Sequence, residues 1–266
     1  MEYPKKSLGQ NFLIDKNIIK KIINLVEIYD REIIEIGSGK GALTDEILKR
    51  KPKSLKIIEK DNKLFDFLKK KYSGNNAIKI FNKDILKFDL EGVDSKRSII
   101  FGNLPYNISS QILVKILKFK KWPPKFHDTI FMFQKELGEK IVSKFPSSHY
   151  GRLSILTRYK MNIFKKFIIS PNCFIPKPKI HSMIIHFKPK QNIFFNIKKI
   201  DSLEKITNIL FSNKRKMINK GFAKLFSDYK NIADNLELNL SSRPGELKNI
   251  DFYKIAEFYE KYKKIN

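Results

Sequence analysis

Short apolar segments recur in the first half of the chain, and each is followed by a segment with helical periodicity. Ala42, Leu43, Ile47 and Leu48, for example, fall at helical spacing. Strands and helices that alternate in this way form βαβ units, in which helices cover both faces of a parallel sheet. The pattern therefore predicts an α/β fold, with strands at Glu32–Ile36, 55–58, 77–81 and 98–101.

The second half of the chain continues this pattern and then changes. A fifth strand is expected at 129–134, helices at 135–144 and 152–161, and a closing strand pair at 163–169 and 180–188. From about Asn192 the periodicity is wholly helical. We therefore expect two domains, an α/β domain at 1–190 and a small all-α domain at 191–266.

A glycine-rich turn separates the first strand from its helix. Gly37, Gly39 and Gly41 would allow a tight turn and a close approach of the backbone to a ligand. Glu59 ends the next strand, where a carboxylate suits two ribose hydroxyls. A dinucleotide such as NAD and S-adenosylmethionine both fit these two features.

A second acidic residue favours S-adenosylmethionine. Asp84 ends the third strand and could accept a hydrogen bond from an adenine amino group. Alone it is equally well an ordinary loop aspartate. The glycines, Glu59 and Asp84 nevertheless follow three successive strands, whose carboxyl ends line one crevice in an open α/β sheet. The GxGxG spacing also departs from the GxGxxG pattern of dinucleotide sites.

The fourth strand ends in the sequence Asn103-Leu104-Pro105-Tyr106. Proline makes this segment stiff and extended, although the same residue types also occur in ordinary turns. The Asn103 carboxamide and a nearby backbone carbonyl could accept both hydrogens of an exocyclic amine, and Tyr106 could stack on the base. Methyl transfer depends mainly on positioning, so it requires neither a metal nor a Ser/His/Asp set.

The charge balance points to a polyanionic partner. The chain has 54 basic and 27 acidic residues and a formal net charge of +27, which favours nucleic acid. Lysine, isoleucine and asparagine usage typical of an A+T-rich genome offers another explanation, a solvated lysine-rich surface. The basic cluster of the helical region is the candidate RNA-binding site: Lys214, Arg215, Lys216 and Lys220.

Other site classes are disfavoured. The sequence has no apolar run long enough to span a membrane and no signal-peptide core, and its single Cys173 fits a reducing cytoplasm. His181 and His186 fall on opposite faces of an expected strand. For His127 and His149 we expect no acidic partner, so no metal site is predicted.

Several short motifs occur together in one known family. They are GQNFL at 9–13, EIGSGKG at 35–41, NLPYNIS at 103–109, YGRLS at 150–154, FIPKPKIHS at 174–182, NKRK at 213–216 and RPGEL at 243–247. On these motifs the chain closely resembles the small-subunit rRNA adenine N6-dimethyltransferases. Ser38 stands where the family usually has proline.

The resemblance implies a Rossmann-like methyltransferase domain that modifies two adjacent adenosines near the 3′ end of small-subunit rRNA, in the assembling subunit. It also implies a monomeric protein. Asn103 and the backbone of Leu104 and Pro105 would hold the amine, and Tyr106 and Phe174, the latter expected in an exposed loop, would sandwich the adenine. The implied cofactor contacts are Asn11, Leu13, Gly37, Gly39, Glu59, Asp84 and Asn103.

Three other readings share part of this pattern. The group that methylates large-subunit rRNA and confers macrolide resistance has the same fold and chemistry, but Leu104 and the RPGEL motif favour the small-subunit group. A non-catalytic RNA-binding assembly or transcription factor would have lost part of the set Glu59, Asp84 and Asn103. The Asn-Leu-Pro-Tyr sequence argues against an NAD enzyme.

Overall fold

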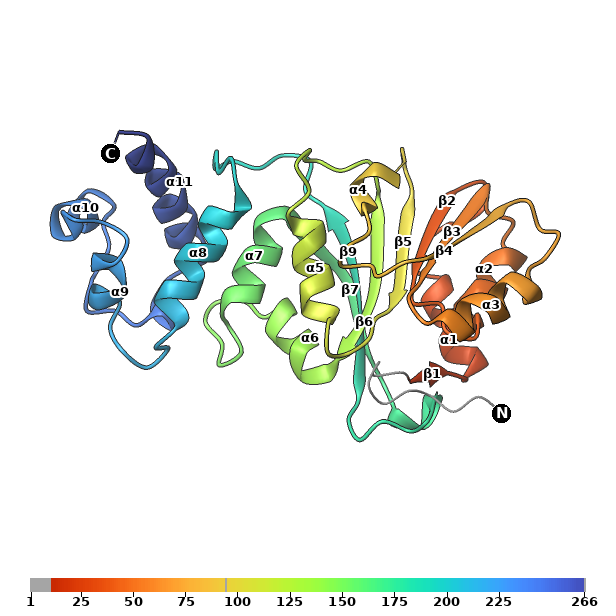
Figure 1. Ribbon diagram of the computed structural model, residues 1–266. Coiled ribbons are helices and arrows are strands. Elements are labelled where there is room, and N and C mark those ends of the chain that lie inside the picture. Colours follow the sequence, from red (N-terminus) through yellow and green to blue (C-terminus); the bar gives the residue numbers. More distant parts are fainter. Residues whose placement is uncertain (1–10, 94, 266) are drawn as a thin grey trace. The chain divides into compact units, whose positions relative to one another are not determined.

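The computed structural model describes residues 11–93 and 95–265, which divide into two compact units (Figure 1). The first unit contains the residues up to Gly138 and Asn162–Pro189, and the second contains Glu139–Met161 and the residues from Lys190 onward. The sequence predicts a single boundary between the two domains, after residue 190. The structure differs because α7 (Arg152–Lys160) contacts the C-terminal helices α8 (Ile200–Phe211) and α11 (Asn249–Ile265).

A seven-stranded sheet forms the centre of the first unit. The strands lie in the order β4-β3-β2-β5-β6-β9-β7, and β2 to β6 are parallel while β9 is antiparallel to β6. The mixed α/β fold and its strands agree with the sequence prediction: β2 (Glu32–Ile36), β3 (Ser54–Glu59), β4 (Ile78–Asn82), β5 (Ile99–Asn103), β6 (Asp128–Gln134), β7 (Met161–Ile169) and β9 (Ser182–Pro189).

The core of this unit follows the two-residue period of the strands. Ile33, Leu55, Ile57, Ile99 and Phe101 are fully buried in one cluster with apolar residues of three helices. These helices lie on one side of the sheet and α5 on the other (Figure 1). Their bounds are α1 (Lys16–Ile23), α2 (Ala42–Lys49), α3 (Asn62–Lys71) and α5 (Ser109–Leu117).

Carboxylates fix the start of two of these helices. Asp15 accepts hydrogen bonds from the N–H groups of Asn17 and Ile18 at 2.9 Å, and Asp61 does the same at the start of α3. Serine is a preferred N-cap residue, but the N-cap position of α5 is occupied by Ile108 and not by one of the two serines that follow it. The Ser109 hydroxyl donates instead to the Tyr106 carbonyl at 3.2 Å.

A small two-stranded sheet lies beside the main one. It pairs β1 (Phe12–Leu13) with β8 (Phe174–Ile175) in antiparallel register, so that Leu13 faces Phe174. Strands of two residues give no periodic signal, which is why the sequence does not reveal them. This pairing holds the segment after Asn11 next to the glycine-rich turn.

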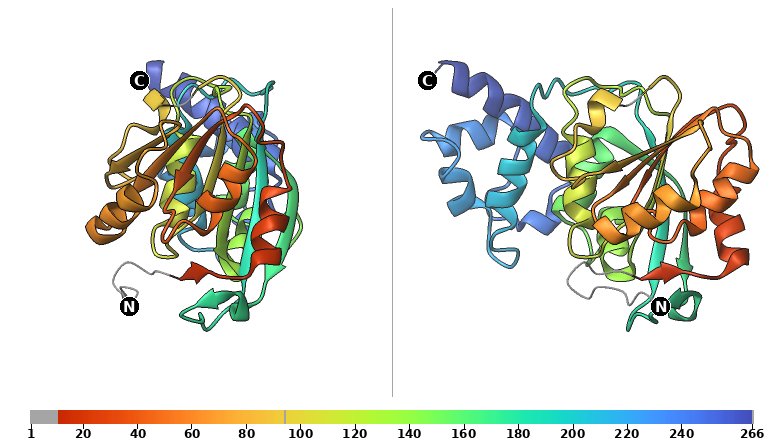
Figure 2. Two further views of the ribbon diagram at one scale, coloured as in Figure 1. Left: turned by 90° about the vertical axis from the view of Figure 1, so that its right-hand side faces the viewer. Right: turned by 45° about the vertical axis from the view of Figure 1, so that its right-hand side comes forward.

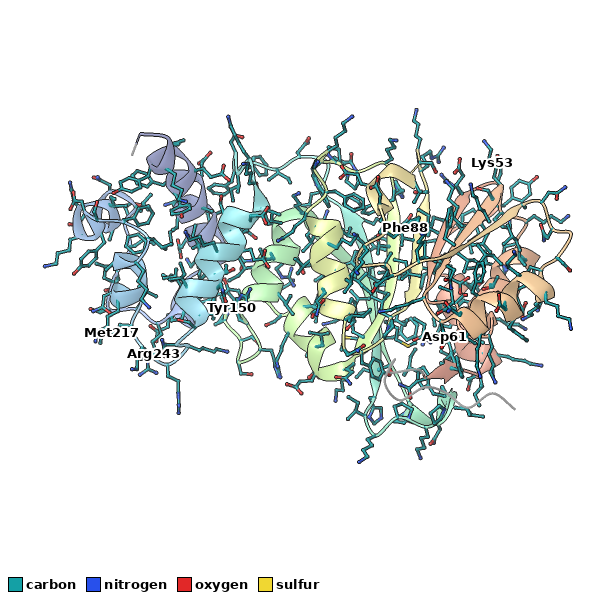
Figure 3. The ribbon with its side chains drawn as sticks, viewed as in Figure 1. Lys53, Asp61, Phe88, Tyr150, Met217 and Arg243 are labelled. Atoms are coloured by element: carbon teal, nitrogen blue, oxygen red, sulfur yellow. The ribbon has the colours of Figure 1, made fainter. Side chains whose placement is uncertain are left out.

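The second unit is helical. The rings of Phe211 and Phe252 stack at 5.5 Å between centroids, and Tyr150, labelled in Figure 3, is fully buried. The expected helix at 152–161 ends one residue earlier, because Met161 adopts an extended conformation. The helices of this unit are α7 (Arg152–Lys160), α8 (Ile200–Phe211), α9 (Asn219–Ala223), α10 (Tyr229–Asn235) and α11 (Asn249–Ile265).

The remaining short elements are α4 (Leu90–Val93), α6 (Lys135–Val142) and the 3₁₀ turns Pro171–Cys173 and Pro244–Glu246. Within the described ranges, 11–93 and 95–265, no helix has both the length and the apolar character needed to cross a membrane.

Candidate active site

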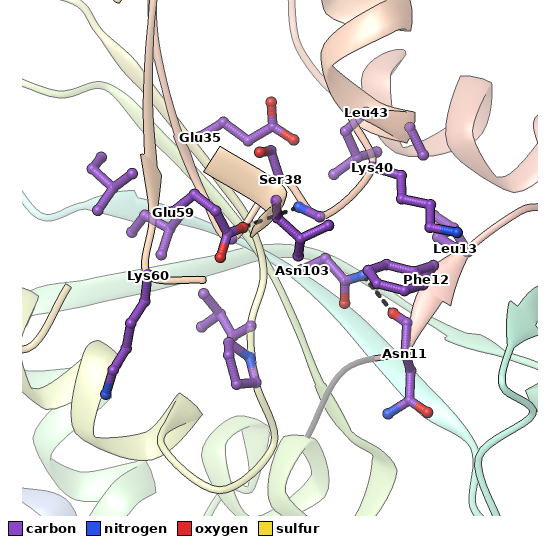
Figure 4. A pocket seen from close by; sticks show the side chains of 18 of the residues that line it. Asn11, Phe12, Leu13, Glu35, Ser38, Lys40, Leu43, Glu59, Lys60 and Asn103 are labelled. Atoms are coloured by element: carbon purple, nitrogen blue, oxygen red, sulfur yellow. Dashed lines mark hydrogen bonds between the residues drawn. The ribbon is translucent and has the colours of Figure 1, made fainter. Parts of the chain in front are cut away.

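A cavity of about 770 Å³ opens at the carboxyl ends of β2, β3, β4 and β5 (Figure 4). This is the edge at which ligands bind in open α/β sheets. The cavity brings together all the residues that the sequence predicts as cofactor contacts, together with the segment Asn103–Tyr106. Its lining includes Asn11, Leu13, Gly37, Gly39, Glu59, Asp84, Asn103, Leu104, Pro105 and Tyr106.

The glycine-rich turn forms one wall of the cavity. Gly39 has a φ of 58°, and a side chain at this position would meet the Phe12 ring at 2.9 Å. The Lys40 ammonium lies 5.2 Å from the centre of the same ring. Phe12 was missed by the sequence analysis, although it lies within the GQNFL motif. Gly9 and Gln10 of that motif lie outside the described residues.

Glu59 links the turn to the next strand. Its carboxylate accepts hydrogen bonds from the N–H groups of Gly39 at 3.3 Å and Asp61 at 3.0 Å. Burial is the largest influence on the Glu59 carboxyl and raises its pKa, while these N–H donors act in the opposite direction. The carboxylate is therefore a buried acceptor at the end of β3, where ribose hydroxyls would lie.

Asp84 is held by a lysine that the sequence did not single out. The Lys60 ammonium donates to Asp84 at 2.8 Å, and the N–H of Leu86 donates to its other oxygen at 2.9 Å. The hydrogen bond from Lys60 is the main reason that the pKa of Asp84 lies below its usual range. Asp84 is therefore a fixed, ionised acceptor at the cavity.

Glu35 is a further cavity residue to which the sequence analysis gave no role. It is fully buried within β2 and accepts a hydrogen bond from the Thr44 hydroxyl at 2.6 Å. Burial raises its pKa to about 7. A signal was present, because Glu35 lies between two isoleucines of the strand EIIEI, which the sequence places inside a parallel sheet that is covered on both faces.

We expect Glu35→Gln to change the pH dependence of stability. The folded-state pKa of about 7 exceeds the reference value of 4.5, so the wild type loses stability as the pH rises between these values. The full loss is at most roughly 3 kcal/mol. The variant lacks this penalty, so its free energy of unfolding relative to wild type should rise from pH 5 to pH 8 in urea denaturation.

Glu237→Gln, at an exposed position, serves as the control for that experiment. Its difference from wild type should stay constant across the same pH range. A constant difference for Glu35→Gln as well would contradict a buried carboxyl that titrates near neutral pH.

The segment Asn103–Tyr106, expected from the sequence to hold the amine, is held from several sides. The Asn103 side-chain amide donates to the Asn11 carbonyl at 3.1 Å, as the dashed line in Figure 4 shows. Among the residues that the structure describes, no donor occupies the Asn103 carboxamide oxygen, which leaves this acceptor for a substrate. Leu104 is buried, and the Tyr106 hydroxyl lies 2.7 Å from that of Ser182. Burial raises the pKa of Tyr106, so the phenol stays neutral.

Phe174 does not lie where the sequence placed it. The expected exposed loop is wrong, because Phe174 is in β8 and only 2% exposed. It belongs to the apolar cluster that also contains Leu13, its partner across the small sheet. It does not line the cavity. Contact with a base would require the ring to leave this cluster, and its role as the second stacking ring stays a prediction.

The basic cluster Lys214, Arg215, Lys216 and Lys220 is exposed in the second unit. The Lys214 ammonium donates to the Ser148 carbonyl at 2.7 Å. The N–H of Ile218 donates to the Ser242 carbonyl, which brings Met217 and Arg243 close together (Figure 3). The structure thus joins the NKRK motif to the RPGEL motif in one surface region.

The histidines do have acidic partners. His127 lies 2.7 Å from Asp128, His186 lies 2.5 Å from the other oxygen of the same carboxylate, and His149 lies 3.8 Å from Glu139. The expectation that His127 and His149 lack such partners is wrong. Across residues 11–93 and 95–265, no group of three or more His, Cys, Asp or Glu side chains could hold a metal ion.

The comparison with protein families decides which family the chain belongs to. The family model described as ribosomal RNA adenine dimethylase matches residues 1–261. The chain belongs to this family. As a ribosomal RNA adenine dimethylase it is a methyltransferase that modifies adenine in ribosomal RNA, in agreement with the resemblance found in the sequence.

Individual relatives support the same assignment. The chain is 45% identical to ribosomal RNA small subunit methyltransferase A of Pelagibacter ubique, over 96% of this chain and 97% of the relative. It is 36% identical to the protein of the same name from Mycoplasma mobile, over 96% of this chain and 97% of the relative.

Solved structures show the same architecture. A dimethyladenosine transferase from Plasmodium falciparum superposes with a TM-score of 0.75 at 27% identity, over 94% of this chain and 98% of that one. The 23S rRNA methyltransferase ErmE superposes with a TM-score of 0.68 at 20% identity, over 94% and 100% of the two chains. The second likeness concerns the fold alone.

Proposed function

We propose that this adenine dimethylase transfers methyl groups from S-adenosylmethionine to the N6 amines of two adjacent adenosines near the 3′ end of small-subunit rRNA. The observation that carries the proposal is the Asn103 carboxamide. Its amide is fixed on the Asn11 carbonyl, and its oxygen is left as an acceptor in the cavity. We further propose that the protein acts as a monomer, in the cytoplasm, on the assembling small subunit.

The cavity suits S-adenosylmethionine. Its volume of about 770 Å³ lies in the range of small-molecule sites. Glu59 would accept from the ribose hydroxyls and Asp84 from the adenine amino group, while the backbone at Gly37 and Gly39 allows close approach. Leu13 and Ile85 add apolar surface. When bound, the cofactor supplies a methyl group carried on a positively charged sulfur.

The residues at the end of β5 would position the acceptor. The Asn103 oxygen and a backbone carbonyl of Leu104-Pro105 accept the two amine hydrogens, which leaves the nitrogen lone pair free to attack. Tyr106, fixed by its contact with Ser182, offers a ring for the adenine. Positioning of this kind can supply a large part of the acceleration. The transfer itself needs no base, because the amine proton leaves after the methyl group has bonded to the nitrogen and its bond to sulfur has broken.

The comparisons favour the small subunit over the large one. The 45% identical relative is named for the small subunit, whereas ErmE is 20% identical. The non-catalytic alternative is disfavoured because Glu59, Asp84 and Asn103 are all present around one cavity.

Subunit labelling tests this proposal. Small ribosomal subunits from a strain that lacks the modification, and large subunits in parallel, would be incubated with the protein and methyl-labelled S-adenosylmethionine. We expect N6-dimethyladenosine in digests of the small subunit only, identified by mass spectrometry. Label confined to large-subunit RNA would move the protein to the resistance group, and no label in either would leave the assembly-factor alternative.

The basic cluster gives a prediction about RNA affinity. If its four residues neutralise phosphates, replacing all four with glutamine should flatten the slope of log Kd against log salt by roughly three to four. Matched replacement of four exposed lysines elsewhere in the second unit, Lys224, Lys230, Lys248 and Lys261, should change the slope much less. An unchanged slope for the cluster variant would show that the cluster is only a solvated surface.

A further inference from the structure

A second depression lies in the first unit, between α1 and the edge strand β7. It is an open groove of about 760 Å³, lined by Asn17, Lys20, Lys21, Asn24, Leu25, Lys165, Lys166 and Phe167. β7 is the last strand of the sheet, with only β9 as its neighbour. Figure 2 shows α1, in red, beside the green and teal strands at this edge. No role has been assigned to the groove above.

The groove is positively charged throughout. Half of its lining residues are lysines, and none carries a carboxylate. Lys20, Lys21, Lys165 and Lys166 are all exposed, and within the described part of the chain none of them forms an ion pair with an acidic side chain. Lys49 and, more weakly, Lys20 lower the pKa of the Glu46 carboxyl, so the charge of Lys20 is partly compensated. The remaining ammonium groups, those of Lys21, Lys165 and Lys166, attract a polyanion.

The groove is also lined by a lysine that contacts an aromatic ring and by neutral amide side chains. The Lys21 ammonium lies 4.4 Å from the centre of the Phe167 ring, a cation–π contact that restricts this flexible side chain. One face of α1 carries polar side chains at three- and four-residue spacing: Asn17, Lys20, Lys21 and Asn24. This row extends over roughly 10 Å along the helix axis. Ammonium and amide groups in such a row can follow successive phosphates and sugars of one strand.

The groove adjoins the active-site cavity. Lys20 lines both depressions, and Lys16 and Ile19 of the same helix line the cavity. A strand that leaves its target base in the cavity would therefore meet α1 first and the groove next. An open depression suits a chain that passes through it better than a small molecule, which needs enclosure.

We propose that the groove between α1 and β7 binds the sugar–phosphate backbone of the ribosomal RNA that flanks the target adenosine. The proposal rests on the proposed function only for the identity of the RNA. The contacts are to phosphate and sugar, so they position the strand without reading its sequence. The groove would hold the strand in register while the base occupies the cavity.

The test uses the full chain with Lys21, Lys165 and Lys166 replaced by glutamine. Lys20 is left unchanged because it lines the cavity. The matched control replaces Lys69, Lys70 and Lys79, three exposed lysines at the opposite end of the sheet. Like the groove variant, the control changes two adjacent lysines, here Lys69 and Lys70, and one lysine that lies over an aromatic ring. The Lys79 ammonium lies 5.3 Å from the centre of the Phe81 ring. Both variants lose three positive charges.

Binding to a fluorescent transcript of the 3′-terminal small-subunit rRNA would be followed by anisotropy across a salt series. We expect the groove variant to flatten the slope of log Kd against log salt by roughly two to three, and the control by less than about one. Melting temperatures and S-adenosylmethionine affinity should match those of the wild type for both variants.

Equal effects of the two variants, or no effect of either, would overturn the proposal, because the charge of the groove would then matter no more than charge elsewhere. The same holds if the wild type fails to bind the transcript. A wild type that binds the transcript through the groove but methylates no subunit would refute the proposed function and leave the groove assignment intact.

Discussion

Asn103→Ala is expected to lower kcat for methyl transfer by roughly 100-fold or more and to weaken S-adenosylmethionine binding much less. The substitution removes the acceptor that would fix the amine and the amide that holds the loop on the Asn11 carbonyl. A misplacement of about 1 Å in the reacting groups can cost about this factor. Methylation of small subunits under single-turnover conditions and cofactor titration by calorimetry would measure the two quantities.

Asn103→Asp separates the two roles of the side chain. Aspartate keeps an acceptor for the amine but cannot donate to the Asn11 carbonyl, and it places a negative charge beside that oxygen. We expect its kcat to lie between those of the wild type and the alanine variant. If both variants instead lost cofactor affinity and retained kcat, Asn103 would act only as a cofactor-binding residue and would not position the amine.

The strands and the carboxylates at their ends could be predicted because local signals fix them. A parallel sheet places Glu59, Asp84 and Asn103 at one edge whatever the details of packing, so their order along the chain was sufficient to bring them together. The glycine turn was equally readable, since its residues have positive φ values that glycine adopts most easily.

The features that were missed depend on contacts between distant segments. Phe174 appeared exposed because prolines follow it, yet pairing with Leu13 buries it. The groove beside α1 arises because the edge strand β7 lies next to a segment more than a hundred residues earlier in the chain. Glu35 is part of a motif, but its raised pKa follows from complete burial, which only the packed structure shows.

The second unit illustrates the same limit. The sequence predicts a boundary near residue 190, where the pattern becomes wholly helical, but in the structure Glu139–Met161 also belongs to the second unit. The helix α7 shows no marked apolar face in its sequence, so its pattern does not indicate which neighbour it packs against. The hydroxyl of Tyr253 donates to the Ile155 carbonyl at 3.1 Å, a contact that ties α7 to the last helix and has no local sequence signal.

Gly39→Ala is expected to reduce the affinity for S-adenosylmethionine by about 100-fold, or roughly 3 kcal/mol. Two effects combine at this position. An alanine at a φ of 58° is strained by about 1–2 kcal/mol, and its Cβ would lie 2.9 Å from the rigid ring of Phe12. Relief of the clash must move the turn, which also breaks the hydrogen bond from the Gly39 N–H to Glu59.

Gly74→Ala separates strain from contact. Gly74 has a φ of 83°, but no atom lies within 4 Å of a Cβ built there, and it does not line the cavity. Both variants should therefore lose stability in thermal denaturation, while only Gly39→Ala should lose cofactor affinity in calorimetry. If the two lost affinity equally, general destabilisation would explain the result. If neither did, the wall formed by the glycine turn and Phe12 would not contact the cofactor.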